Sequence, residues 1–305
     1  MIKKVEWLFL IIFLLIPGNL FSQESSLARI TDKARFSASA SSAHQFKSNI
    51  DGGGDVSITH YGVGVGGAIP LADTLGLRTH LSYDREEYHF SDRNAFLIPD
   101  PWSQVDRIGL SMRLRYTCSH KWNIDAGPVV QYAGEAGAQF DDSLMYGGLI
   151  TAAYRVNPDF SIGFGAGVFS RFHETKIFPS LIVSWKINDR LRLGNGSPLG
   201  LIGPAGLELS YKFTDNWETA IGGGYRSSRF RLDQNGPTEG GIGENRSWTV
   251  YARMTGKLGS VFLIDLYAGA DFRGEMKLQD NNGNDIRSLD YDTAPILGLN
   301  IRTSI

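Results

Sequence analysis

Three polar residues of one predicted strand, His80, Ser82 and Asp84, have the side-chain types of a hydrolytic triad. In such a triad a histidine takes the proton of a serine hydroxyl while a carboxylate orients the imidazole. Because the three residues are spaced by two, they share one face of the strand, with neighbours about 6.6 Å apart. That separation is beyond direct hydrogen-bond reach unless the side chains lean together, and no oxyanion donor is evident. We therefore assign no catalytic residue and keep a hydrolase only as an alternative.

A glycine-rich stretch at residues 62–67, GVGVGG, satisfies the G-x-G-x-x-G spacing of a dinucleotide-binding turn. That turn needs a helix directly after it, because the helix N-terminus binds the pyrophosphate. Here residues 68–70 and another strand pattern follow instead. The glycines therefore predict a thin strand face rather than a nucleotide site, and a reversal of the apolar phase near His60 predicts a β-bulge.

Residues 279–285, QDNNGND, have the composition of a calcium-binding loop. The glycine and the final carboxylate do not fall where an EF-hand needs them, so we expect a surface loop in which divalent-ion binding is incidental. We predict no metal site and no cofactor. The single cysteine, Cys118, excludes an internal disulfide.

Strand periodicity is clearest in the two segments 247–255 and 262–273. In the first segment Trp248, Val250 and Met254 fall on one face, and polar residues fall on the other. After a tight turn the second segment repeats this alternation, which is the pattern of a β-hairpin with one apolar face. Each strand has about ten residues, the length that crosses a bilayer when it is tilted.

The same alternation recurs along the chain and predicts fourteen strands, with twelve as the fallback if the two weakest are absent. The expected strands cover residues 35–42, 56–70, 75–83, 107–116, 122–132, 146–156, 160–168, 177–187, 190–193, 206–213, 217–225, 247–255, 262–273 and 295–305. Tight turns alternate with longer polar segments at residues 43–54, 86–104, 135–143, 195–204, 228–246 and 274–292. This alternation predicts an all-β fold, an antiparallel up-and-down transmembrane barrel with short periplasmic turns and long extracellular loops.

Aromatic residues on the apolar face form two predicted belts, one beside the short turns and one nearer the long loops. Trp122 and Trp217 belong to the first belt, and Tyr132 and Tyr225 to the second. The belts are separated by roughly 20 to 25 Å, close to the height of an outer-membrane apolar band. From residue 34 to 305 the chain resembles bacterial outer-membrane β-barrels, and it is similar to uncharacterised barrel families more than to trimeric general porins. The apolar phase that continues to Ile305 resembles their C-terminal assembly signal, which implies the barrel-assembly machinery as a partner.

The first residues predict export. Lys3 and Lys4 precede an apolar run that is too short to span a membrane as a helix, and a helix-breaking pair and Ser22 follow. This pattern is typical of a cleaved secretory signal. We expect a signal peptide at residues 1–22, a periplasmic lead-in at 23–33 and the barrel at 34–305, located in the outer membrane of a Gram-negative bacterium. The formal net charge of −2 gives no bulk attraction for nucleic acid.

The polar phase of the strands predicts the lining of a hydrated lumen. The basic residues expected there are Arg78, Arg107, Arg113, Arg115, Arg155, Lys186, Lys212, Arg226, Arg253, Arg273 and Arg302. They outnumber the acidic residues of the same phase, so we expect a net-basic lumen and a passive, mildly anion-selective pore for small solutes. Two alternatives stay open: a closed barrel whose long loops bind an extracellular partner or lipid, and an outer-membrane lipid-modifying enzyme.

Acidic residues concentrate in the late loops. They are Glu239, Glu244, Glu275, Asp280, Asp285, Asp290 and Asp292. We expect these loops to be mobile and to bridge to outer-membrane lipopolysaccharide through divalent ions, and we expect deletion of residues 279–289 to leave folding intact.

Overall fold

The computed structural model describes residues 33–91, 96, 98, 100–195, 205–259 and 261–304. The strands are β1 (Arg35–Asn49), β2 (Asp55–Ala72), β3 (Leu75–Phe90), β4 (Gln104–Thr117), β5 (Trp122–Glu135), β6 (Leu144–Arg155), β7 (Phe160–Arg171), β8 (Glu174–Lys186), β9 (Leu191–Gly194), β10 (Ala205–Lys212), β11 (Trp217–Arg231), β12 (Ile242–Leu258), β13 (Phe262–Gln279), β14 (Asp285–Tyr291) and β15 (Ala294–Ser304). A short 3-10 helix, η1 (Asp141–Ser143), precedes β6. In the described part of the chain, no helix is long and apolar enough to cross a membrane.

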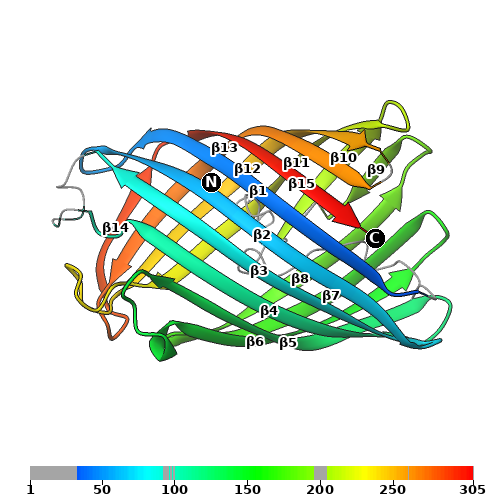
Figure 1. Cartoon of the computed structure of the whole chain (residues 1–305), viewed down its shortest axis with the longest axis horizontal. Coiled ribbons are helices and arrows are strands. Elements are labelled where there is room, and N and C mark those ends of the chain that lie inside the picture. Colours follow the sequence, from blue (N-terminus) through cyan, green and yellow to red (C-terminus); the bar gives the residue numbers. More distant parts are fainter. Residues whose placement is uncertain are drawn as a thin grey trace, which may run out of the picture.

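Each strand pairs with its neighbours in antiparallel order, and β1 pairs with β15 to close the cylinder shown in Figure 1. The first part of β13 pairs with β15, and its second part pairs with β14. Because β14 and β15 follow each other along the same edge of β13, they occupy one position in the wall. The prediction of a fourteen-stranded antiparallel barrel is therefore confirmed.

The wall has the two faces that the sequence predicted. Large apolar side chains on the outer face are exposed, among them Leu110, Leu114, Val250 and Leu266, while the alternate residues are mostly buried or half-buried. Short turns and the C-terminal strand end lie at one end of the cylinder, and β14 lies at the other (Figure 1). We call these the short-turn end and the long-loop end.

A charge on the outer face tests this orientation. Leu114 is 48% exposed and Leu266 is 55% exposed, and both lie within their strands between turn and loop. We expect Leu266→Arg to lower the free energy of unfolding in lipid by about 2 to 4 kcal/mol, because a cation near the bilayer midplane loses its hydration. Leu114 lies three residues from the turn end of β4, so Leu114→Arg should lower the free energy of unfolding by less. Denaturant unfolding in lipid vesicles measures the loss. A variant as stable as the parent protein would contradict a lipid-facing position.

The strands extend further toward the long-loop end than the sequence predicted. β1 continues to Asn49, β3 to Phe90 and β11 to Arg231, and most of residues 274–292 form the β13–β14 hairpin. Leu289 of that hairpin is buried in an apolar core, so the expectation that residues 279–289 can be deleted harmlessly is withdrawn. The predicted signal peptide at 1–22, the lead-in before residue 33, most of the segment 195–204 and the terminal Ile305 lie outside the described residues.

β2 itself has no bulge near His60, since it pairs with β3 in continuous register from Val56 to Pro70; the irregularity lies on the neighbouring strand β1, between Gln45 and Ser48, opposite Ile58 and Val56. The apolar phase reverses for another reason. Val56 and Ile58 are fully buried inside the barrel, whereas Val63 and Val65 are exposed on the outer face. Apolar residues thus switch from lipid contact to an internal core within one regular strand. This switch shows that the interior of the long-loop end is apolar.

Candidate functional site: the interior of the barrel

The interior holds the predicted basic residues, and several of them form ion pairs. Arg115 binds Asp125 through two hydrogen bonds of 2.8 and 3.0 Å, and both residues are buried. Arg253 contacts Glu208, Glu218 and Asp265, at 2.5, 2.9 and 3.3 Å. Arg302 also reaches Asp265, at 3.0 Å. Much of the positive charge of these arginines is thus neutralised locally.

Four other predicted lining residues lie toward the edges of the interior. Lys186 and Lys212 bind Asp189 and Asp215 of the adjoining short turns, at 2.6 and 2.7 Å. Arg155 borders a cavity of about 530 Å³ near the short-turn end. Arg273 is exposed and has φ 49°, where two residues of β13 oppose one residue of β12. The strict alternation by which we assigned Arg273 to the inner face ends at this bulge.

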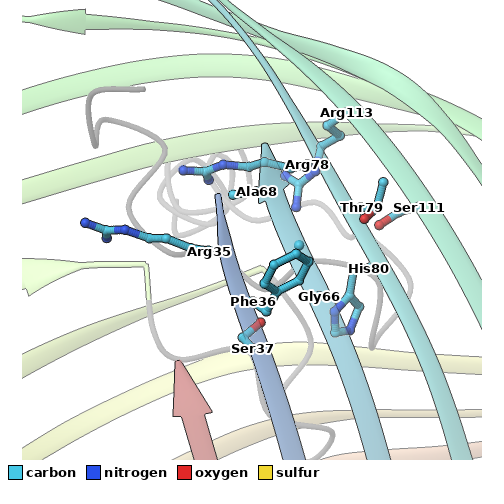
Figure 2. A pocket seen from close by; sticks show the side chains of 11 residues that line it. Arg35, Phe36, Ser37, Gly66, Ala68, Arg78, Thr79, His80, Ser111 and Arg113 are labelled. Atoms are coloured by element: carbon cyan, nitrogen blue, oxygen red, sulfur yellow. The ribbon is translucent and has the colours of Figure 1, made fainter. Parts of the chain in front are cut away.

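Arg78 and Arg113 lie directly opposite each other on β3 and β4. They line a small pocket with Arg35, His80 and hydroxyl-bearing residues near the short-turn end, as Figure 2 shows. The eleven described residues that line this pocket include no aspartate or glutamate. Asp125, which pairs with Arg115, also acts electrostatically on Arg113.

The possible triad is not assembled. Ser82 is 5% exposed, and its hydroxyl makes no hydrogen bond to any described residue. His80 instead lines the basic pocket beside Arg113. A histidine that does not contact the serine hydroxyl cannot take its proton in this conformation. The geometry therefore gives no support to a hydrolase at these residues.

A hairpin from the wall enters the long-loop half of the lumen. Residues 226–232 are all buried, so both faces of the end of β11 and the first residue after it are covered. Arg231 forms a parallel bridge to Gly134 of β5, although five strands separate β5 from β11 in the wall. We call residues 226–246, the distal part of the β11–β12 hairpin, the plug. It crosses the barrel interior.

One face of the plug binds β2, β3 and β4 through buried charges. Arg226 contacts the His60 ring at 2.9 Å, and His60 lies 3.3 Å from the Glu86 carboxylate. Arg107 donates two hydrogen bonds to Glu86, at 2.8 and 2.9 Å. Ser228 donates to the same carboxylate at 3.1 Å. Arg107 and Arg226 are therefore brought together by Glu86 and His60, and they anchor the plug to the opposite wall.

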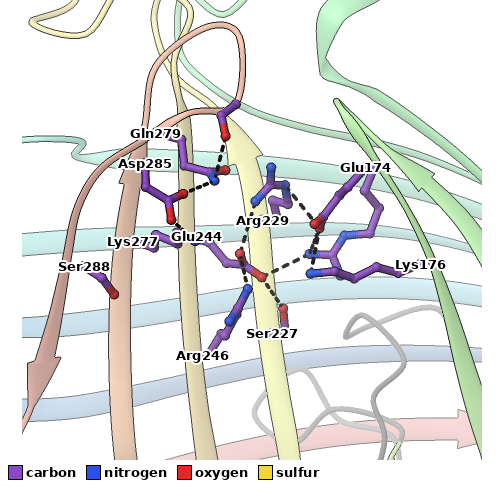
Figure 3. Close-up of polar contacts among 12 residues, drawn as sticks. Glu174, Lys176, Ser227, Arg229, Glu244, Arg246, Lys277, Gln279, Asp285 and Ser288 are labelled. Carbon is purple, nitrogen blue, oxygen red and sulfur yellow. Dashed lines mark hydrogen bonds and ion pairs between the residues drawn. The ribbon is translucent and has the colours of Figure 1, made fainter.

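The other face of the plug surrounds Glu244, which is 1% exposed (Figure 3). Arg171, Arg229 and Arg246 contact its carboxylate at 3.3, 3.2 and 2.7 Å, and Ser227 donates to it at 2.9 Å. Glu244 lies beyond Trp248, which pairs with Tyr225 of the belt nearer the long loops, and so outside the membrane-spanning part. The prediction that it belongs to a mobile loop is wrong.

The pKa of Glu244 reflects these contacts. Burial by itself raises the pKa, but the hydrogen bond from Arg246 and the charges of Arg171 and Arg229 outweigh it and lower the pKa to about 2. The carboxylate is therefore ionised at neutral pH and holds the three guanidinium groups together.

An apolar core fills the remaining space at the long-loop end. Phe230 of the plug is fully buried and packs against Tyr88 and Trp102, with ring centroids 6.1 and 5.5 Å away. The ring lies over Gly243 of the paired strand, where an added Cβ would come within 2.4 Å of it. Met276 and other apolar residues from β2, β4 and β13 complete the core. Packed side chains thus occupy much of the interior in this half of the barrel.

Sequence reasoning missed the plug because it placed residues 228–246 in a loop. One signal could have found it: the apolar residues near the long loops occupy the inward phase, as Val56 and Ile58 do on β2 and Met276 and Leu278 do on β13. Side chains that face a hydrated lumen have no reason to be apolar. Inward apolar residues at one end indicate that something packs against them.

The turn at residues 280–284 does not have the form of a calcium site. The Asp280 carboxylate accepts hydrogen bonds from the backbone of Asn282 and Asn284 and from the Asn284 side chain, at 2.8 to 2.9 Å. These bonds fold the turn on itself. Among the described residues, no group of three or more histidine, cysteine or acidic side chains is placed to hold a metal ion.

Solved structures with the same fold are outer-membrane proteins. A FadL homologue from Pseudomonas aeruginosa has a TM-score of 0.53 and 15% identity, and the match covers 96% of this chain and 98% of that one. An outer-membrane channel from Pseudomonas putida F1 has a TM-score of 0.48 and 10% identity, with 96% and 98% coverage. The toluene transporter TodX of P. putida has a TM-score of 0.43 and 10% identity, with 92% and 91% coverage. At these identities the likeness concerns the fold, which is that of an outer-membrane β-barrel.

No curated protein matches the chain significantly. A family model does match, over residues 108–303, which run from β4 to the last strand and include the plug. The chain belongs to this family, the domain of unknown function DUF6268.

Proposed function

We propose that the protein is an outer-membrane channel for small polar solutes, and that the plug holds its long-loop end closed in the conformation described above. The observation that carries the proposal is the origin of the blockage. This half of the lumen is filled by the distal part of one wall hairpin, which is joined to the rest of the barrel by side-chain contacts, by one bridge to β5 and by the pairing of residues 242–246 with residues 275–279 of β13. If this hairpin moved together with the paired end of β13, the lumen would open while the wall from Trp248 to the short turns stayed paired.

The interior below the plug supports a passage rather than a purely structural barrel. It contains the cavity of about 530 Å³, which is lined by Ser161, Ser184, Ser210 and several charged residues and reaches the short turn at Pro158. A fourteen-stranded barrel is wide enough to hold water when nothing fills it. A gated channel requires a polar passage and a segment that can move out of it, and the two ends of this barrel offer these two features.

The closed barrel with a binding loop is the second candidate, and the buried core at the long-loop end favours it. The two candidates differ in whether the plug moves. In planar bilayers we expect the purified protein to be mostly silent, with rare openings of stable conductance. Replacing residues 226–246 by the short turn of another hairpin would then give a continuously open pore. A barrel that stays silent after this replacement would refute the channel.

Selectivity follows from which arginines are neutralised. Arg115 and Arg253 are paired with carboxylates and Asp125 also acts electrostatically on Arg113, so we propose that the net-basic lumen prefers anions only mildly. Reversal potentials of the plug-replaced protein in a potassium chloride gradient measure that preference.

We also propose that the protein is exported and cleaved near residue 22. We propose that it assembles through its last strand and that lipopolysaccharide is its partner in the outer leaflet.

A further inference from the structure

Three aromatic side chains form a continuous row on the outer face of β11 to β13. Register places Tyr225, Trp248 and Phe272 side by side on these neighbouring strands. The Tyr225 and Trp248 rings meet edge to face with centroids 5.1 Å apart, and Phe272 is 39% exposed. In membrane proteins such aromatic residues gather where the apolar layer meets the lipid head groups. The row therefore marks the head-group level on this side of the barrel.

Arg273 follows this row directly, at the bulge in β13. Its backbone has φ 49°, in the left-handed region that glycine favours. After the bulge Gly274 faces inward, because a Cβ there would come within 2.0 Å of the buried Tyr291 ring. Asp271 and Gly274 on the inner face are buried, whereas Phe272 and Arg273 are exposed. The bulge thus turns Arg273 to the outside of the barrel, one residue beyond the aromatic row.

The guanidinium group of Arg273 is not engaged by its acidic neighbour. Glu275, two residues further along β13, contacts Arg246 at 3.7 Å and accepts a hydrogen bond of 2.7 Å from the Ser288 hydroxyl. Among the residues that the structure describes, Arg273 forms no ion pair and no hydrogen bond. Residues held in sparsely populated backbone conformations gather at binding sites. An exposed arginine held in this way at the head-group level points to a ligand in the membrane.

We propose that Arg273 directly binds a phosphate group of an outer-leaflet glycolipid, whose acyl chains lie against the aromatic row and the apolar wall at Val250. The inference rests on the part of the proposed function that makes lipopolysaccharide the outer-leaflet partner, and it names the contact. A guanidinium group presents a planar fork of donors that matches two phosphate oxygens. Basic side chains at a membrane surface also attract anionic head groups. This contact needs no divalent ion, unlike the bridges expected of the acidic loops.

Titration of the detergent-solubilised protein with bisphosphorylated lipid A, with EDTA present to remove divalent ions, tests the contact. We expect saturable binding that is weakened at least about tenfold by Arg273→Gly, since a hydrogen bond to a charged group contributes that much or more. Dephosphorylated lipid A should bind the parent protein as weakly. Arg273→Gly should keep the heat-modifiable migration of a folded barrel and resist denaturant at least as well as the parent protein, because glycine fits φ 49°.

Arg85→Gln is the matched control. Arg85 lies on the outer face two residues beyond Tyr83, which is level with Tyr132 of the same belt. Asp106 neutralises Arg85 through two hydrogen bonds of 2.8 and 3.3 Å, so this variant should bind lipid A as the parent protein does. Arg273→Lys keeps the charge without the fork and should bind with intermediate strength.

The outcomes separate this inference from the proposed channel. Equal binding by the parent protein and a folded Arg273→Gly would overturn the contact, as would equal losses in Arg273→Gly and Arg85→Gln. Binding that appears only when calcium is added would also overturn it and would favour bridging by the acidic loops. A loss specific to Arg273→Gly would uphold the contact even if the plug-replaced protein stays silent in bilayers. Conductance of that protein without lipid A binding would uphold the channel and overturn the contact.

Discussion

Glu244→Gln should open the long-loop end of the barrel. The substitution keeps the size of the side chain but leaves Arg171 and Arg229, each with its side chain at most 3% exposed, without their common buried carboxylate. Removing one partner of a buried ion pair typically costs about 3 to 5 kcal/mol, or a factor of roughly 10² to several times 10³ in an equilibrium constant. Part of this free energy stabilises the closed position of the plug relative to the open one. We therefore expect frequent openings in bilayer recordings and rapid proteolysis within residues 226–246.

Glu174→Gln is the matched control for that variant. Glu174 approaches the same two arginines, at 4.0 and 3.7 Å, but its side chain is 28% exposed. Ion pairs that water can reach contribute little, so this variant should stay closed. Equal opening by the two variants would show that the charge of the loops, rather than the buried contact, controls the plug.

The parent protein should also open in acid. The pKa of Glu244 is about 2 in the closed state, below its ordinary value of 4.5, so its stabilisation of the plug is complete above about pH 4.5. The stabilisation is lost as the pH falls through the lowered pKa toward 2. The open probability should therefore rise on the acid side, and this rise should be much smaller in Glu244→Gln. Recordings at a series of pH values compare the two proteins.

Phe230→Ala should loosen the plug through its apolar face. Phe230 is fully buried between Tyr88, Trp102 and the backbone of Gly243. Truncation of a buried phenylalanine to alanine costs about 3 to 5 kcal/mol, from lost transfer energy and the cavity that remains. The barrel wall does not depend on this ring, so the heat-modifiable migration should persist while the plug opens. Bilayer recordings and limited proteolysis measure the change.

Phe140→Ala provides the comparison, because Phe140 is also near the long-loop end but is 61% exposed. Its ring stacks on Tyr132 outside the apolar core, so little burial is lost. We expect it to behave as the parent protein does. If Phe230→Ala were also as silent and as protease-resistant as the parent, the packed core would not be what holds the plug.

The sequence by itself determined the wall of this protein. Whether a side chain faces lipid or the interior follows from its position in a period-two pattern, which each strand carries without reference to distant residues. Trp248, Val250 and Leu266 therefore identified the outer face, and the alternation of short and long connections identified the antiparallel barrel. The four-residue β9 was also predictable, because its sequence lies between a tight turn and the polar segment at residues 195–204.

Only the tertiary structure decided what fills the interior. Alternation places Arg107 and Arg226 inside, but it does not say whether they meet water or each other, and it left Glu244 in a loop. Arg226 meets His60 across the barrel, 166 residues away in the chain, and Arg107 meets Ser228 from 121 residues away. Such contacts depend on the path of the plug through the lumen. That path depends on packing of Phe230 and on charge pairing, which are properties of the assembled barrel and of no single strand.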